Sequence, residues 1–294
     1  MALMNCPHCE EKIQDNQFTC TNCGYTLKDM EKGESYNLQG LATFDAEKPE
    51  SYEPAIEMFR KSAENHCDNG QINLGTVLNL LGTRYYNGDG VSFCLKSAEK
   101  CFKESADLGN ENAKKNIATL YLQYGEMYSN NKKVRANLEL AEEYYKKATE
   151  YNPERCKRKL IKFYINCHFN FKHGIGGTTK DPYAAQLYLQ KAKDIDSKIV
   201  EEIGQDYYSR AKEMLSQGVT KENYRRINAY LKKASHLTEN DLTDDLIQFY
   251  KSVAVCSKKG KSGFKKNMDR SNRYYGKAAA LGDAAAMKMY KEYK

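Results

Sequence analysis

Residues 55–63 read Ala-Ile-Glu-Met-Phe-Arg-Lys-Ser-Ala, and the spacing of their apolar side chains returns along the chain. Steps of 43 residues from Phe59 reach Phe102, Tyr145, Tyr188, Leu231 and Tyr274. A second series with the same spacing contains Leu74, Ile117, Leu160, Ile203, Leu246 and Met289. A fixed period of roughly 20 to 50 residues indicates a solenoid of repeated units.

Each unit is predicted to be a hairpin of two helices. Ala55, Phe59, Ser62 and Ala63 follow the i, i+4, i+7, i+8 pattern of one helix face, which predicts a helix over 53–65. A turn rich in Gly and Asn follows, which suits a left-handed residue at a helix end. The second helix carries the Leu74 series and a column of small or compact residues, namely Gly82, Gly125, His168, Ala211 and Ala254. One hairpin cannot bury its apolar face alone, so we expect about six of them to stack into one all-α solenoid.

Several of these motifs resemble Sel1-like repeats, which are relatives of the tetratricopeptide repeat. They are Tyr144–Ala148, Tyr274–Asp283, Asn73–Gly75 and Gly88–Val91, and the resemblance extends over about 34–294. The fourth and fifth units depart from the pattern at Asp194–Asp196 and Leu237–Glu239, where we expect the helix register to shift. The resemblance implies a right-handed superhelix and a role as an adaptor for protein complexes.

The N-terminus carries four cysteines in the pattern C-x2-C-x10-C-x2-C, namely Cys6, Cys9, Cys20 and Cys23. Two such turns aim four thiolates at one point, which is the ligand set of a structural Zn²⁺ site. Gly24 follows the last cysteine and suits a turn with positive φ. Two redox pairs are the alternative, but the βαβ context that such pairs need is missing. The stretch is similar to short zinc ribbons, which bind protein or nucleic acid or only stabilise an end.

We therefore expect three parts: a zinc ribbon at 1–27, a linker and capping helix at 28–49, and the repeats at 50–294. The formal net charge of +7 permits an acidic partner without demanding one. No apolar run is long enough to span a bilayer, so no membrane is expected. The start lacks the basic and apolar regions of a secretory signal, and the six other cysteines have no paired spacing, so we expect a cytoplasmic protein.

Four cations of the first helices form the candidate partner-binding column: Arg60, Lys103, Lys146 and Lys232. A stacked column of cations could hold an acidic peptide or phosphates. The alternative is an ordinary solvated helix face. In this strict spacing, Leu189 and Tyr275 interrupt the column.

Nucleic-acid binding is the alternative function, because two basic clusters contain aromatic neighbours. The first comprises Arg155, Lys157, Arg158, Lys159 and Lys162, near Phe163, Tyr164, Phe169 and Phe171. The second comprises Lys258, Lys259, Lys261, Lys265, Lys266, Arg270 and Arg273, with Phe264. Most of these aromatic residues fall on core positions, which favours a structural role for them.

No arrangement of residues predicts catalysis. His66 and Cys67 are adjacent and would point in different directions, without a third group to orient them. The glycine-rich stretch 174–177 follows no strand, so it does not form a phosphate-binding loop. The prediction is a scaffold that binds a protein or peptide in the solenoid groove, not an enzyme.

Overall fold

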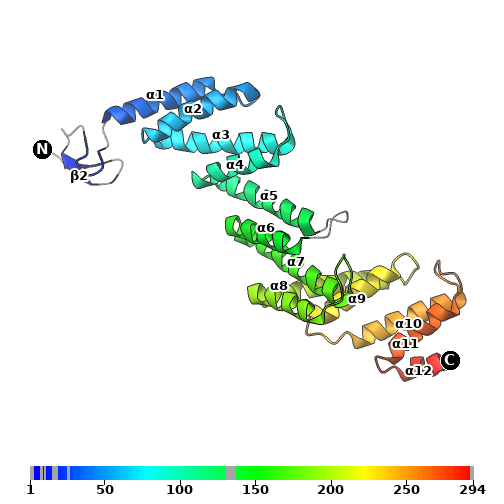
Figure 1. Cartoon of the computed structure of the whole chain (residues 1–294). Coiled ribbons are helices and arrows are strands. Elements are labelled where there is room, and N and C mark those ends of the chain that lie inside the picture. The colour runs from blue at the N-terminus through cyan, green and yellow to red at the C-terminus, as the bar shows by residue number, and fades with distance from the viewer. Residues whose placement is uncertain are drawn as a thin grey trace. The chain divides into compact units, whose positions relative to one another are not determined.

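The computed structural model describes residues 3–6, 9, 11–14, 19–24, 27–129 and 137–291. In this part of the chain, two short strands precede twelve α-helices (Figure 1). The chain divides into two compact units, residues 1–156 and 157–294, and the boundary falls near the start of α7.

The first unit begins with an antiparallel strand pair, β1 (Leu3–Asn5) and β2 (Lys12–Gln14). A 3-10 turn at Pro49–Ser51 lies between the first two helices. The helices are α1 (Leu27–Thr43), α2 (Tyr52–Glu64), α3 (Asp68–Asn87), α4 (Leu95–Asp107), α5 (Glu111–Ser129) and α6 (Leu138–Tyr151). Each packs against the next one along the chain, so the apolar face of one helix is covered by its neighbours.

Helix α1 packs against α2 and α3, and it covers much of the segment 28–49 for which the sequence predicts a linker and capping helix. Ser62 Oγ donates to the carbonyl oxygen of Gly33 at 2.6 Å. One hairpin later, Ser105 Oγ donates to the carbonyl oxygen of Gly75 at 2.5 Å. Because α1 receives α2 in the way that α3 receives α4, it acts as the second helix of a hairpin that lacks its first helix.

The turns inside the hairpins differ in one detail from the prediction. Gly109 and Gly282 adopt positive φ, 87° and 97°, as expected. In the first hairpin, however, the left-handed residue is His66, with φ 57°, and not a Gly or Asn. Asn65 Nδ2 donates to the carbonyl oxygen of Lys61 at 2.7 Å, which keeps Asn65 at the C-terminal end of α2. The chain therefore changes direction at the next residue, His66.

The second unit contains most of α7 (Pro153–His173), followed by α8 (Pro182–Ser216), α9 (Tyr224–Leu237), α10 (Thr243–Lys259), α11 (Met268–Ala279) and α12 (Ala284–Lys291). Helix α8 is in fact two helices, because Asp196 has extended dihedral angles inside it. The Asp196 carboxylate accepts from the backbone N–H of Ile199 at 3.2 Å and from Lys157 Nζ at 2.8 Å. Residue 196 is therefore the turn between the two helices of the fourth hairpin.

The helix register departs from the strict period in two hairpins. In the fourth, the buried residues are Ala185, Leu189 and Ala192, one position later than a spacing of 43 predicts. In the fifth, where we also expected a shift, Ile227, Leu231 and Ala234 keep the original register, so that prediction was wrong. The sixth shifts again, with Ser271, Tyr275 and Ala278 buried. One extra loop residue before a helix turns it by about 100°, which moves the apolar stripe onto the next residue.

The all-α solenoid prediction is confirmed, since the described part of both units, apart from the short strand pair, is built of helices that pack in chain order. The superhelix handedness stays a prediction. No described helix has both the length and the apolar composition that crossing a bilayer requires.

Candidate functional site

The four N-terminal cysteines lie together. Their sulfur atoms are all within 4.8 Å of one another. Cys6 Sγ lies 3.7 Å from Cys23 Sγ, and Cys9 Sγ lies 3.6 Å from Cys20 Sγ. Zn–S bonds of about 2.3 Å in a tetrahedron place the sulfurs about 3.8 Å apart. The observed separations therefore fit a four-thiolate zinc site.

Local backbone structure holds these thiols in place. The strand pair closes onto the first turn, where the Cys6 N–H donates to the Glu11 carbonyl oxygen at 2.8 Å. Gly24 has φ 75°, as expected, and its N–H donates to the Cys20 carbonyl oxygen at 2.8 Å. Hydrogen bonds from the Glu11 backbone and the Asn22 side chain lower the pKa of Cys9 to about 7. These hydrogen bonds favour the thiolate form that binds metal.

In the first unit, the three predicted partner-binding cations all have carboxylate partners within the chain. Arg60 pairs with Glu104 at 2.6 Å, Lys103 with Glu99 at 2.8 Å, and Lys146 with Glu142 at 2.8 Å. Glu99 raises the pKa of Lys103, as the closest charge to it. The side chains remain about half exposed, at 49%, 46% and 56%. Arg60 also lines a small cavity of about 200 Å³ between α2, α3 and α4.

Lys232, the fourth predicted cation, is different. It is half-buried on α9, and its side-chain ammonium has no ion pair or hydrogen bond within the described residues. Two lysines that the sequence analysis missed, Lys233 and Lys277, share this property. In the observed register, the residue two places after each core residue is Lys61, Glu104, Lys147, Lys191, Lys233 or Lys277. A strict spacing of 43 residues from Arg60 does not reveal this column, because it reaches Leu189 and Tyr275 where cations were expected.

The first basic cluster is largely paired within its unit. Lys157 pairs with Asp196 at 2.8 Å, and Arg158 pairs with Glu202 at 2.7 Å and with Asp206 at 2.8 Å. Its aromatic neighbours Phe163, Tyr164 and Phe169 are buried. Phe264 in the second cluster is 3% exposed and packs on Tyr224 at 5.2 Å between ring centroids. These four rings are therefore core residues, as the sequence analysis favoured.

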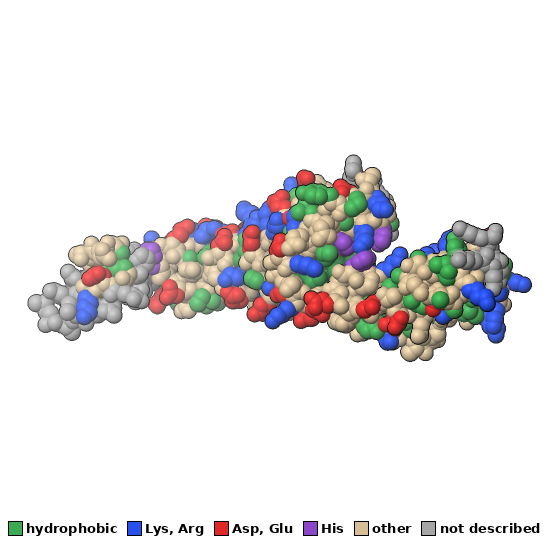
Figure 2. Space-filling view, turned by 90° about the horizontal axis from the view of Figure 1, so that it is seen from below, with side chains coloured by type: hydrophobic (Ala, Val, Ile, Leu, Met, Phe, Trp, Pro, Cys, Tyr) green, Lys and Arg blue, Asp and Glu red, His purple; other side chains and the backbone are tan. Residues whose placement is uncertain are grey.

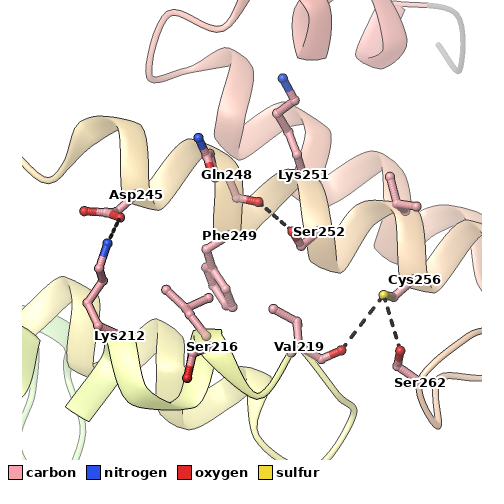
Figure 3. A pocket seen from close by; sticks show the side chains of 13 residues that line it. Lys212, Ser216, Val219, Asp245, Gln248, Phe249, Lys251, Ser252, Cys256 and Ser262 are labelled. Atoms are coloured by element: carbon pink, nitrogen blue, oxygen red, sulfur yellow. Dashed lines mark hydrogen bonds and ion pairs between the residues drawn. The ribbon is translucent and has the colours of Figure 1, made fainter. Parts of the chain in front are cut away.

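A groove of about 730 Å³ lies between the second half of α8 and α10 (Figure 3). At one end, Asp245 accepts from Lys212 Nζ at 3.3 Å and from Tyr208 Oη at 2.8 Å. At the other end, Cys256 Sγ lies 3.9 Å from Ser262 Oγ. The carboxylate is already engaged and stands away from the thiol. The lining therefore provides no base beside Cys256 that could make it a nucleophile.

Comparison with known proteins agrees with the helical repeats. Four segments match the profile of the Sel1 repeat: residues 71–110, 120–150, 170–197 and 252–283. A search of the curated proteins found no match.

Three solved structures are similar to the chain. A Sel1 repeat protein from Oxalobacter formigenes is 18% identical, with 84% of this chain and 87% of that chain covered and a TM-score of 0.25. A protective antigen with an SLR fold from uropathogenic Escherichia coli strains is 19% identical, with 89% and 63% covered and a TM-score of 0.21. A putative sel1 repeat protein from Klebsiella pneumoniae subsp. pneumoniae is 14% identical, with 89% and 98% covered and a TM-score of 0.20. At these TM-scores the superpositions carry no argument of their own.

The stacked hairpins define an α-helical repeat protein. Its repeats include four segments of the Sel1 type, preceded by a cluster of four cysteines.

Proposed function

We propose that this protein is a scaffold that binds a peptide or protein partner along the first helices of its hairpins. The observation that carries the proposal is the repetition of exposed cations at one register. Arg60, Lys103 and Lys146 each follow a core residue directly, and each keeps about half of its side chain in solvent. A surface that repeats in this way suits an extended partner, which several hairpins could contact at once.

The repeat type supports this proposal. Proteins built from Sel1 repeats generally act as scaffolds for protein interactions. The same reasoning supports a non-enzymatic role, since scaffolding requires only a stable surface. We also infer a cytoplasmic setting, because all ten cysteines lie in the described residues and none is in a disulfide.

We further propose that Cys6, Cys9, Cys20 and Cys23 hold one structural Zn²⁺. The sulfur separations support this assignment, and four thiolates leave no open coordination position for a substrate. When bound, the metal would tie two turns together in a segment too short to form its own core. The ribbon would then stabilise the start of the chain beside α1.

The test is affinity capture. The full chain, purified with zinc, would be immobilised and exposed to a lysate of the source cell, and bound proteins would be identified by mass spectrometry. We expect at least one stoichiometric partner, and we expect its loss from the variant Arg60→Glu, Lys103→Glu, Lys146→Glu. A matched control is Lys48→Glu, Lys114→Glu, Lys115→Glu, which changes the same net charge at sites outside the first helices. A chain that captures no stoichiometric partner would contradict the proposal.

A further inference from the structure

The two units treat the cations of their first helices differently. In the first unit, a carboxylate four residues earlier pairs with the cation in four cases: Glu57–Lys61, Glu99–Lys103, Glu142–Lys146 and Glu143–Lys147. In the second unit, the residues four positions before Lys232, Lys233 and Lys277 are Asn228, Ala229 and Arg273. These three lysines have therefore lost the carboxylate that their counterparts in the first unit retain.

The sequence of the second unit reinforces this separation of charge. Helix α9 contains no Asp or Glu, and neither does α7 from Lys157 onward. Three carboxylates of the unit pair instead with cations of the second helices: Asp196 with Lys157, Asp245 with Lys212, and Asp283 with Lys251. Lys232, Lys233 and Lys277 have no such carboxylate partner among the described residues. Figure 2 shows a face on which histidine side chains gather beside Lys and Arg side chains.

Aromatic rings hold two of these lysines in place. Lys233 Nζ lies 4.9 Å from the ring centroid of Tyr207 and 5.4 Å from that of Phe169. Lys277 Nζ lies 4.4 Å from the ring centroid of Tyr274 and 5.5 Å from that of Tyr250. Stacking on ring faces orders the ammonium groups but does not neutralise them. Each lysine is therefore positioned for a partner that the chain does not supply.

The local electrostatics agree with this geometry. Burial lowers the pKa of Lys233, and burial together with Lys232 and Arg273 lowers the pKa of Lys277. Burial and Lys232 also lower the pKa of Lys172, at the end of α7. Lys232 thus lies within electrostatic reach of both Lys172 and Lys277. Negative charge brought to this surface would relieve the mutual repulsion of all three.

The amide side chains that stand in place of these carboxylates have oxygen atoms without a hydrogen bond. Asn228 aligns with Glu142 of the first unit, and Asn272 occupies the same position in the last hairpin. The Oδ1 atoms of both are buried, and neither has a hydrogen-bond partner among the described residues. Because both oxygens are buried, a partner cannot reach them; they show only that amides, and not carboxylates, stand at these positions.

We propose that Lys172, Lys232, Lys233 and Lys277, here named the lysine row, bind an acidic segment of a partner protein. The inference rests on the proposed scaffold function and names the chemistry of its partner. A peptide fits better than a nucleic acid, because the rings beside the row are already covered. Phe169 and Tyr250 are 4% and 5% exposed, and lysines occupy their faces, so bases cannot stack on them.

The experiment uses fluorescence anisotropy with the full zinc-loaded chain. The probe is a short labelled Glu-rich peptide, and the comparison peptide has Gln in place of every Glu. We expect binding of the Glu-rich peptide only, and weaker binding as salt rises. The variant Lys232→Gln, Lys233→Gln, Lys277→Gln should weaken it by about tenfold or more. The control Lys259→Gln, Lys265→Gln, Lys266→Gln removes the same charge from exposed positions of the same unit and should leave binding within about twofold.

A second variant guards against misfolding. Asn228→Glu keeps every lysine and restores the acid four residues before Lys232, as Glu142 precedes Lys146. This variant should also weaken binding of the Glu-rich peptide. Equal loss in both triple variants, or displacement of the peptide by a single-stranded oligonucleotide at lower concentration than by unlabelled peptide, would overturn the inference. Lysate capture separates the two proposals: partners retained by the row variant would refute the lysine row and leave the scaffold function standing.

Discussion

The ring of Phe102 lies directly against the α-carbon of Gly82. A Cβ at residue 82 would come within 2.7 Å of the ring, which is closer than any side chain tolerates. The same contact recurs one hairpin later, where a Cβ at Gly125 would lie 2.9 Å from the ring of Tyr145. The small residue of each second helix thus receives the large residue of the next first helix. This contact sets the distance between successive hairpins in the first unit.

Gly82→Ala should therefore destabilise the first unit, although alanine favours helix. Forcing a methyl group into a filled core costs about 1–3 kcal/mol, and improved helix propensity returns about 1 kcal/mol. We expect a net loss of up to about 2 kcal/mol in the free energy of unfolding, measured by urea denaturation.

Gly75→Ala on the same helix is the matched control. A Cβ there would find its nearest neighbour at 3.5 Å, an ordinary contact. This variant should be neutral or more stable than the natural chain, by up to about 1 kcal/mol. Equal destabilisation by both variants would mean that the close approach of Phe102 is not what makes residue 82 glycine.

Much of this architecture is predictable from sequence, because stacking requires each hairpin to present the same residues to the next. The core residues of the first three and the fifth hairpins follow the period of 43. A helix before the first hairpin was also expected, because Asn37–Leu38 and Gly40–Leu41 resemble Asn73–Gly75 of a second helix, and α1 lies there. The spacing of the four cysteines falls within one short segment, so it predicts their proximity without knowledge of the rest of the fold. Their sulfur atoms do lie close together.

The register of the fourth and sixth hairpins could not be predicted in this way. Tyr188 and Leu189 are adjacent, as are Tyr274 and Tyr275, and either member of each pair could face the core. A loop can be one residue longer at a small cost in free energy, so the local sequence does not decide which member of each pair is buried. This ambiguity concealed the lysine row. A count of acidic residues along α9 would have revealed it, because that helix has none.

The four-cysteine cluster should bind one zinc ion per chain. Cys20→Ser removes one of four thiolates from a buried position and should abolish stoichiometric zinc, measured by elemental analysis of the purified protein. Acid should release zinc from the natural chain, because protons compete with metal for the thiolates.

The control for the zinc measurement is Cys256→Ser, a half-buried cysteine outside the cluster. It should retain one zinc and the same acid release. If Cys20→Ser retained a full equivalent of tightly held zinc, the assignment of the four ligands would be wrong.

His168 should make the second unit less stable in acid. Its ring is 4% exposed, and burial lowers its pKa below the ordinary value, while its Nδ1 lies 2.8 Å from the Ala185 carbonyl oxygen. Below about pH 6.5 the unfolded chain takes up a proton that the folded ring resists. The free energy of unfolding should therefore fall as pH drops below about 6.5 and level off below the folded-state pKa.

The variant His168→Gln should flatten this dependence, measured as urea midpoints at several pH values. The slope should decrease without vanishing, because the pKa values of His173 and His236 are also lowered by burial, that of His236 to about 4. His66→Asn changes an exposed residue in the first unit with φ 57°, which asparagine tolerates, and should leave the slope as it is. An unchanged slope in His168→Gln would show that His168 is not the group responsible.

The first unit should gain affinity for acidic peptides when its internal carboxylates are removed. Glu99→Gln with Glu142→Gln reproduces the amides of the second unit and releases Lys103 and Lys146 from their ion pairs. Without the Glu99 carboxylate, the pKa of Lys103 should fall toward its ordinary value, since that carboxylate is the main cause of its rise. Anisotropy with the Glu-rich peptide should show binding that is several-fold tighter, by about three- to tenfold.

The control for this gain is Asp68→Asn with Glu111→Gln, which removes the same negative charge from the second helices of the first unit. Glu111 pairs with Lys114 on α5, and Asp68 lies in the first turn of α3, so neither carboxylate neutralises a cation of the first helices. This variant should tighten binding by less than about twofold, through net charge alone. Equal gains in both double variants would mean that the peptide responds to total charge. A gain in peptide affinity only in the Glu99→Gln, Glu142→Gln variant would mean that the carboxylates beside the cation column decide which hairpins can bind an acidic partner.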